Sequence, residues 1–290
     1  MNKFGAQNMV APLKRVMVRR PGKAMANADP AKWHYAAPLS LRSLCDNHDA
    51  IVKVIRGAGA DVLFLDDDDD GLADAVFTYD PSLVTNEGAI IMRMGKGLRC
   101  NESRVHREFY TRHDIPILGT IQEPGTIEAG DCLWLDTKTL CVGLGFRTNE
   151  AGLNQLREFL SPLGVAVCPY DLPFAGGAEG CLHLMSLISL LDHDLALVYL
   201  PLLPVRLYHF LKERHVHCLA APADEYTASG SVSVNVLALG PRHCVMIDGF
   251  PKTAELVRNA GCDLATFHGD ELCLKAEGGP TCLTRPILRE

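Results

Sequence analysis

Residues 132–167, CLWLDTKTLCVGLGFRTNEAGLNQLREFLSPLGVAV, decide the fold. Two short apolar runs, 132–135 and 140–144, flank a polar turn and read as paired β-strands. The helix-like stretch 150–160 follows, with leucines at 153, 156 and 160 on one face. A further apolar run at 165–167 ends the stretch. The order is strand, strand, helix, strand.

The same order recurs along the chain. Further copies begin with predicted strands at 75–79, 181–190 and 232–239. A fifth copy combines the two chain ends: strand 281–284 would pair with strand 16–18, followed by helix 41–58 and strand 61–65. A repeat near 50 residues is typical of closed arrays. We therefore predict an α/β fold, a five-bladed propeller-like ring closed by its first and last strands; an open mixed α/β sheet is the alternative. We expect one catalytic domain, 1–290, with residues 1–10 as a loose tail.

Composition narrows the functional classes. The 290 residues carry a formal charge of −7, which argues against nucleic acid or an anionic membrane as the main partner and allows a small cationic substrate. Eleven cysteines without a C-x-x-C pair indicate reduced thiols in a cytoplasmic protein. No run is long and apolar enough for a membrane span. The acidic run 66–70 is predicted to be a solvated loop.

Polar residues recur on the predicted first strand of successive units, roughly 50 residues apart: Asp80, Glu128, His183, Asn235 and Cys282. In a closed ring such positions converge on one central cavity. Cys282 follows a Gly-Gly turn, where a thiol can be exposed and act as a nucleophile beside a histidine base and carboxylates. Each residue also has a simpler reading: a core cysteine, a core histidine, or acidic turn residues facing solvent.

Six segments, taken together, resemble the guanidine-modifying enzymes: arginine deiminases, dimethylarginine dimethylaminohydrolases and amidinotransferases. They occur in the family's order and are residues 76–80 (VFTYD), 127–131 (IEAGD), 145–152 (GFRTNEAG), 181–184 (CLHL), 235–239 (NVLAL) and 278–282 (GGPTC). The resemblance implies a five-bladed α/β propeller, the pentein fold, which the repeat had already suggested.

The resemblance also implies a mechanism. Cys282 would attack the guanidinium carbon, and His183 would protonate the departing amine and then activate water. Asp80 and Glu128 would bind the guanidinium, and Arg147 would contact the substrate α-carboxylate. No metal or organic cofactor is required, and the partner would be a small guanidino compound.

Some positions depart from the arginine deiminase pattern. Met185 stands where deiminases carry an aspartate and would suit an alkylated guanidine, and Asp74 is similar to bacterial dimethylarginine hydrolases. Tyr79 stands where those enzymes often carry an acid. Arg93 and Arg99 lie in a glycine-containing loop that could close over a substrate carboxylate.

The leading hypothesis is a hydrolase that converts arginine or a methylated arginine to citrulline plus an amine or ammonia. An arginine deiminase or dihydrolase, an amidinotransferase and a catalytically silent binding protein are the alternatives. A homodimer stays open.

Overall fold

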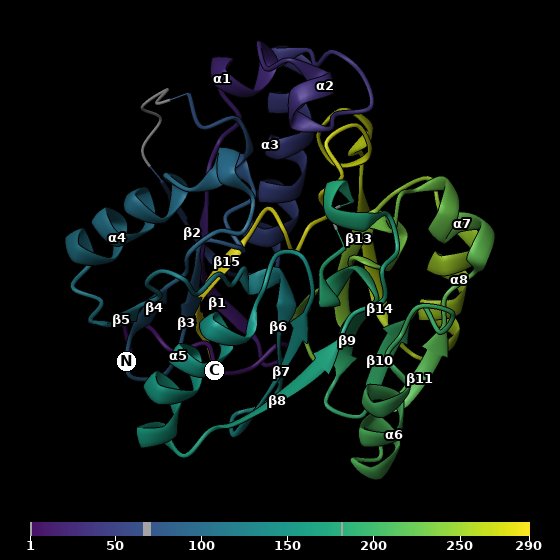
Figure 1. The fold of residues 1–290 in the computed structure, drawn as a ribbon. Coiled ribbons are helices and arrows are strands. Elements are labelled where there is room, and N and C mark those ends of the chain that lie inside the picture. The colour runs from purple at the N-terminus through teal and green to yellow at the C-terminus, as the bar shows by residue number, and fades with distance from the viewer. Residues whose placement is uncertain (1, 66–70, 181) are drawn as a thin grey trace.

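Five three-stranded sheets surround a common centre, with the long helices on the outside (Figure 1). This computed structural model describes residues 2–65, 71–180 and 182–290. The acidic run 66–70, predicted as a solvated loop, lies outside the described residues. The predicted five-bladed α/β fold is confirmed, because the strands of the described residues form five separate three-stranded sheets and not one open mixed sheet.

All five sheets share one strand pattern. The first strand runs antiparallel to the middle strand, which runs parallel to the third. Four of the sheets are continuous in sequence: β3 (Ser82–Val84), β4 (Ala89–Ile91) and β5 (Ile117–Thr120); β6 (Cys132–Asp136), β7 (Thr139–Leu144) and β8 (Ala166–Asp171); β9 (Ile188–Asp192), β10 (Leu195–Val198) and β11 (His217–Ala220); β12 (Leu237–Gly240), β13 (His243–Ile247) and β14 (Asp263–Phe267).

The fifth sheet closes the ring. β15 (Arg285–Arg289) pairs antiparallel with β1 (Leu13–Val18), which pairs parallel with β2 (Asp61–Phe64). The predicted pairing of the chain ends is therefore confirmed, although the last strand begins at Arg285 and not near Thr281. Both termini lie on the same side of the molecule in Figure 1.

A helix connects the middle strand to the third strand in each unit, as the parallel pairing of those strands requires. These helices are α3 (Leu41–Gly57), α4 (Glu102–Arg112), α5 (Glu150–Leu160), α6 (Val205–Glu213) and α8 (Pro251–Asn259). In α5 the side chain of Asn149 caps the first turn, and Leu153, Leu156 and Leu160 are fully buried. Shorter helices occupy the connections: α1 (Lys23–Ala26), α2 (Pro30–Trp33) and α7 (Ala223–Ala228).

The predicted site residues do not lie on the first strands, which corrects the sequence interpretation. Each precedes its strand by a few residues, in an irregular segment or at the edge of a short 3-10 helix. The expected strand at 75–79 is also wrong: Ala73–Val76 is a 3-10 helix. Buried irregular turns carry the same apolar residues as a buried strand, so composition alone misassigned them.

The loose N-terminal tail is likewise corrected. Gly5 N donates to Ile287 O, and Arg289 N donates to Gly5 O, both at 2.8 Å. Ala6, Gln7 and Val10 are buried. The segment is ordered because it satisfies the backbone groups on the free edge of β15.

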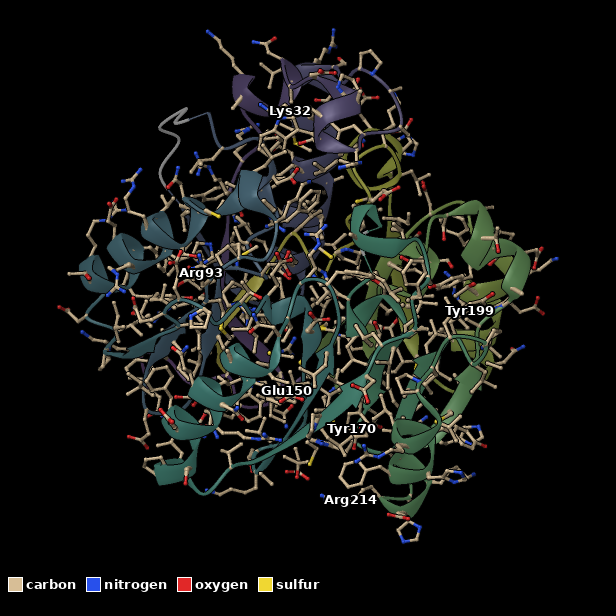
Figure 2. The ribbon with its side chains drawn as sticks, viewed as in Figure 1. Lys32, Arg93, Glu150, Tyr170, Tyr199 and Arg214 are labelled. Atoms are coloured by element: carbon tan, nitrogen blue, oxygen red, sulfur yellow. The ribbon has the colours of Figure 1, made fainter. Side chains whose placement is uncertain are left out.

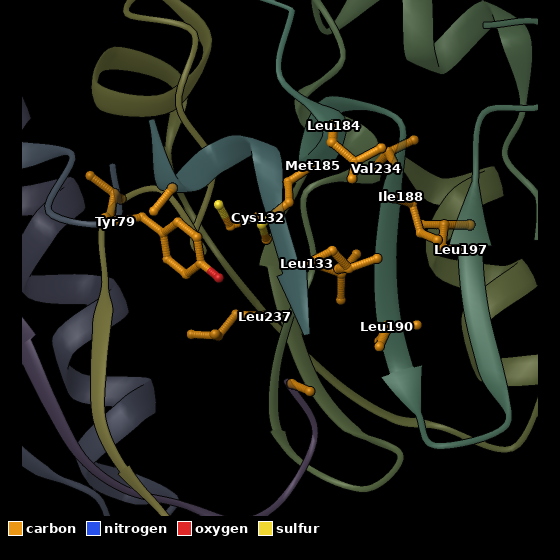
Figure 3. Packing of buried hydrophobic residues seen from close by; sticks show 14 of the residues in the cluster. Tyr79, Cys132, Leu133, Leu184, Met185, Ile188, Leu190, Leu197, Val234 and Leu237 are labelled. Atoms are coloured by element: carbon orange, nitrogen blue, oxygen red, sulfur yellow. The ribbon is translucent and has the colours of Figure 1, made fainter. Parts of the chain in front are cut away.

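Apolar side chains fill the space between the sheets. Figure 3 shows part of this packing. Tyr79 and Cys132 face each other, Met185 lies beside Leu184, and Leu133 lies close to both pairs. This continuous core fixes the positions at which the first strands begin. No helix among the described residues is long and apolar enough to cross a bilayer.

Candidate active site

One pocket gathers four of the five repeated polar positions: Asp80, His183, Asn235 and Cys282. It lies where the first strands of several blades begin, and its empty space, including the part open to solvent, is about 700 Å³. The convergence predicted from the repeat is therefore present in the structure. Segments from all parts of the chain contribute to the remaining lining, which comprises Trp33, His34, Asp74, Phe77, Lys96, Arg99, Arg147, Ser186, Ser231, Val232, Ala276, Glu277, Gly278 and Gly279.

Glu128, the fifth position, lies behind the histidine and does not line the pocket. Its Oε2 is 2.7 Å from His183 Nε2, and it has no solvent exposure. Its Oε1 accepts hydrogen bonds from the backbone N–H groups of Gly95 and Lys96 at 2.9 and 3.0 Å. Arg147 Nη1 lies 3.3 Å from Oε2. The carboxylate is thus placed to orient the imidazole and not to touch a ligand.

The ionised form of Glu128 is strongly favoured. Burial by itself would raise its pKa, but the hydrogen bond and charge of His183 and the guanidinium groups of Arg147 and Arg99 outweigh burial and lower the pKa well below its usual value. A fixed negative charge therefore stands beside the imidazole and stabilises the imidazolium that forms when His183 takes up a proton.

The Arg-Thr-Asn segment holds this region together. Thr148 Oγ1 donates to Asp131 Oδ2 at 2.6 Å and accepts from Glu128 N at 3.2 Å. Asp131 Oδ1 accepts from Leu184 N at 2.9 Å, which fixes the backbone next to His183. Burial raises the pKa of Asp131 to about 6. Thr148 of the Arg-Thr-Asn motif therefore mainly connects, through Asp131, the segment that carries Glu128 with the segment that carries His183.

Asp80 is held by a second buried ion network. Its Oδ2 is 2.6 Å from Arg99 Nη1, and its Oδ1 accepts from Gly130 N at 3.0 Å. Arg99 also forms a paired ion bridge with Glu102 and donates to Phe77 O at 3.1 Å. Each Asp80 oxygen keeps a second lone pair that can accept from a ligand. Arg99 lines the pocket, but its guanidinium is committed to these partners.

Gly130 allows His183 and Asp80 to approach each other. A Cβ at this position would lie 2.5 Å from His183 Nδ1 and 2.8 Å from Asp80 Oδ1. Those distances are too short for real side chains, so any larger residue would push the base and the carboxylate apart.

Cys282 is positioned by Asn235 and the Gly-Gly turn. Asn235 Oδ1 accepts from Thr281 N at 2.9 Å, so its Nδ2 faces Cys282 Sγ and donates to it at 3.1 Å. A Cβ on Gly279 would lie 2.5 Å from the Asn235 side chain. The turn thus brings the thiol against an amide donor, which favours the thiolate form.

The remaining predicted residues have mixed outcomes. Arg93 lies outside the pocket, where it pairs with Glu123 and is labelled in Figure 2. Asp74 lines the pocket, and its oxygens accept from Tyr35 Oη at 2.7 Å and Lys96 Nζ at 2.8 Å. Met185 packs in the core and is not part of the lining, so it does not provide the apolar wall expected for an alkylated guanidine.

Comparison with known proteins agrees with this geometry. The arginine deiminase family model matches residues 70–204. A dimethylarginine dimethylaminohydrolase of Streptomyces coelicolor is 30% identical over 285 residues, covering 94% of this chain and 96% of its own. The chain belongs to the guanidine-modifying, or pentein, superfamily. Its enzyme class is that of the hydrolases acting on carbon–nitrogen bonds, which the deiminase and dimethylaminohydrolase relatives share.

Solved structures of the superfamily share the fold. A dimethylarginine dimethylaminohydrolase of Pseudomonas aeruginosa, complexed with citrulline, superposes with a TM-score of 0.76 at 22% identity, covering 96% of this chain and 100% of its own. An amidinotransferase of the saxitoxin pathway from Microseira wollei gives 0.82 at 16% identity, covering 99% and 98%. The pentein fold is therefore common to hydrolases and transferases.

The polar or aromatic pocket residues that the sequence interpretation missed as site residues include Trp33, Lys96 and Glu277. Lys96 lies in the loop expected to carry Arg93 and Arg99, and Glu277 directly precedes the Gly-Gly turn. Their closeness to a known motif was the available signal. Trp33 lies in α2, far from the motifs in sequence. Only the tertiary fold brings it to the pocket, so the sequence held no signal for it.

Asp80, Glu128 and His183 offer three potential metal ligands within 4.8 Å of one another. Both carboxylates, however, already face protein guanidinium groups, Arg99 and Arg147. A metal cation would therefore meet two positive charges. The donor set suits hydrogen-bonding cations better than a metal ion.

Proposed function

We propose that the protein hydrolyses the guanidinium group of arginine or an N-methylated arginine through a covalent intermediate on Cys282. The products are citrulline and an amine or ammonia. The observation that carries the proposal is the presence of Cys282, His183 and Asp80 in one pocket, with His183 bonded to the buried Glu128. No metal or organic cofactor takes part.

Substrate binding begins at Asp80. Its lone pairs accept hydrogen bonds from the planar guanidinium, a charge-assisted contact that orients the central carbon. Phe77, Val232 and Ala276 supply an apolar part of the lining, which suits methyl groups on a terminal nitrogen. The dimethylaminohydrolase name of the Streptomyces coelicolor relative supports a methylated substrate.

In the first half-reaction Cys282 Sγ, as a thiolate, forms a bond to the guanidinium carbon. His183 donates a proton to the departing nitrogen, the C–N bond breaks, and an amine or ammonia leaves. An S-alkylthiouronium remains on Cys282. Asn235 favours the thiolate before attack through its hydrogen bond to the sulfur.

In the second half-reaction the now neutral His183 takes a proton from water. The hydroxide adds to the thiouronium carbon, the C–S bond breaks, and citrulline is released with Cys282 restored. One water is consumed for each amine released. Glu128 acts as a positioning residue, since it holds the imidazole and stabilises its protonated form.

The test is a turnover screen of the purified protein with arginine, monomethylarginine and dimethylarginine. Citrulline, ammonia and methylamines are measured together, so that both products of each turnover are identified. We expect citrulline in equal amount to one amine from at least one substrate. Cys218→Ser, at a half-buried cysteine in β11 outside the pocket, controls for general thiol loss and should retain activity. Absence of citrulline from all three substrates would contradict the proposal.

Amidino transfer is the second candidate, because the superposition with the amidinotransferase is high in TM-score. An amine would then replace water in the second half-reaction. Incubation with arginine and glycine distinguishes the two: guanidinoacetate and ornithine indicate transfer, whereas citrulline indicates hydrolysis. A silent binding protein would show neither product and would bind arginine unchanged.

A further inference from the structure

Arg285, the first residue of β15, is a buried cation without a carboxylate partner among the described residues. It is 2% exposed, and its Nε has no hydrogen-bond partner in the part of the chain that the structure describes. Burying a charge without a counter-charge is costly. The contacts that the guanidinium does make must therefore provide the compensation.

Tyr79 provides these contacts. Arg285 Nη2 donates a hydrogen bond to Tyr79 O, and the guanidinium carbon lies 3.8 Å from the centre of the Tyr79 ring. A charged donor forms a stronger hydrogen bond than a neutral one, and a cation over an aromatic face is attracted to it. Tyr79 is itself buried, so water competes little for either contact. The arginine thus holds both the backbone and the ring of one residue.

Tyr79 is also bonded to the nucleophile segment through its other backbone group. Its N–H donates to Cys282 O at 3.1 Å, and Asp80 is the next residue along the chain. The segment that carries Asp80 is therefore joined to the C-terminal segment at Cys282 and again at Arg285. A single hydrogen bond would let the two segments rotate about it, whereas two bonds fix their relative orientation.

Asp80 and Cys282 act on the same group in the proposed reaction. Asp80 holds the guanidinium while Cys282 Sγ attacks its central carbon, so their relative placement sets the approach of sulfur to carbon. Reacting atoms must be aligned at about 3–3.5 Å, and a misplacement of about 1 Å can cost about 10²-fold in rate. Both side chains line the pocket, whereas Arg285 does not. Any influence of the arginine on the reaction is therefore indirect.

We infer that Arg285 is a positioning residue for the proposed reaction: through Tyr79 it fixes the orientation of the guanidinium-binding Asp80 relative to the nucleophile Cys282. This inference rests on the proposed function. Because the bound guanidinium moves with Asp80, Arg285 governs the rate of the chemical step more than the binding of the substrate.

Arg289 offers a matched control on the same strand. It is also buried, it also lacks a carboxylate partner among the described residues, and its Nε likewise has no hydrogen bond there. Its guanidinium donates to Ala11 O at 2.7 Å and to Ala238 O at 2.8 Å, and neither alanine lines the pocket. The two arginines thus place the same charge at opposite ends of β15, and only Arg285 is bonded to the residue next to Asp80.

The test compares Arg285→Met, Arg285→Lys and Arg289→Met with the wild type, on the substrate that the turnover screen selects. Arg285→Met should lower kcat about 100-fold and change KM by less than about threefold. Arg285→Lys should recover about tenfold of that loss, because an ammonium can still donate to Tyr79 O but lacks the planar fork that stacks on the ring.

Arg289→Met should keep the kcat and KM of the wild type. All rates are divided by the folded fraction, which denaturant unfolding measures, so that a loss of stability alone does not count as a loss of activity. If either methionine variant does not fold, Arg285→Lys and Arg289→Lys are compared, and only Arg285→Lys should lose kcat.

Alkylation by iodoacetamide separates positioning from activation of the thiol. The reagent reacts with Cys282 Sγ without help from Asp80, so its rate at Cys282 in the Arg285 variants should stay within about twofold of wild type. An alkylation rate that falls in parallel with kcat would overturn the inference, because the arginine would then act on the nucleophile itself.

An unchanged kcat in the Arg285 variants, or an equal loss in the Arg289 variants, would also overturn the inference while the proposed function stands. If the wild type forms no citrulline from any guanidino substrate, the proposed function fails and the inference fails with it.

Discussion

His183 Nε2 lies 2.7 Å from Oε2 of Glu128, a carboxylate with no solvent exposure. The pair joins two blades of the ring and places a fixed negative charge behind the imidazole that faces the pocket. The histidine that we propose as the acid–base group is therefore oriented by Glu128, a residue that does not line the pocket.

Replacing Glu128 by glutamine should lower kcat about 10²- to 10⁴-fold, because the acid–base contribution of His183, which is usually of that size, depends on the carboxylate that orients it. The amide keeps the shape of the side chain but removes the charge that stabilises the imidazolium. Steady-state citrulline release measures the loss. An unchanged kcat would show that the pair has no part in proton transfer.

The same substitution predicts a pH-dependent loss of stability. Since the folded pKa of Glu128 is lowered, its ionised form stabilises the protein fully above the unfolded pKa of about 4.3. That contribution is lost as the pH falls toward the folded value. Glu128→Gln should therefore destabilise by about 3–5 kcal/mol at pH 7 and by less at pH 3, as measured by denaturant unfolding. A constant difference would contradict this account.

Gly130→Ala should disable the site and leave the fold in place. The added methyl group would collide with His183 Nδ1 and Asp80 Oδ1, and relieving that collision costs about 1–3 kcal/mol. We expect at least about a tenfold loss of kcat/KM from the displaced base. Gly57→Ala, where a Cβ meets nothing within 4 Å, is the control. Equal activity of the two variants would refute the steric argument.

Asn235→Ala should slow the alkylation of Cys282 by iodoacetamide at pH 7. The amide donor that lies 3.1 Å from the sulfur is lost, so less of the thiol is present as thiolate. Peptide mapping assigns the modified cysteine and separates Cys282 from the others. An unchanged alkylation rate at Cys282 would mean that Asn235 does not activate it.

His48→Leu should stabilise the protein at acidic pH. The ring is fully buried, and neither of its nitrogens has a hydrogen-bond partner among the described residues. Burial lowers its pKa to about 4, below the unfolded value of about 6.5. The stability contributed by the neutral ring is thus complete above pH 6.5 and is lost as the pH falls toward 4.

The variant's advantage over wild type should therefore grow between pH 7.5 and pH 5 in thermal unfolding. His209→Leu, at an exposed position on α6, provides the comparison and should show no such growth. Parallel behaviour of the two variants would contradict the assignment to buried His48.

The architecture could be predicted from the sequence because each repeated unit leaves its own pattern of apolar residues. Each unit needs an antiparallel strand pair and a helical crossover, and the spacing of apolar residues along the chain indicates both. The convergence of His183 and Cys282 followed from equivalent positions in that repeat. The loop-bound residues could not be predicted in the same way, since Arg99 meets Asp80 only through the folded path of the 3-10 segment Gly97–Arg99.

The errors have similar physical causes. Residues 75–79 have the apolar character of a strand, yet they form a 3-10 helix and turns beneath the pocket. The N-terminal segment lacks periodicity and was expected to be loose, but it pairs with the edge of β15. Pairing of distant backbone segments leaves no local pattern to detect.

Citrulline release by the Cys282→Ser variant tests the central claim most directly. The serine hydroxyl occupies the same place beside Asn235 but is a far weaker nucleophile at neutral pH. The account predicts a loss of activity of more than about a thousandfold with an unchanged fold and retained substrate binding. Full activity in this variant would contradict covalent catalysis by Cys282.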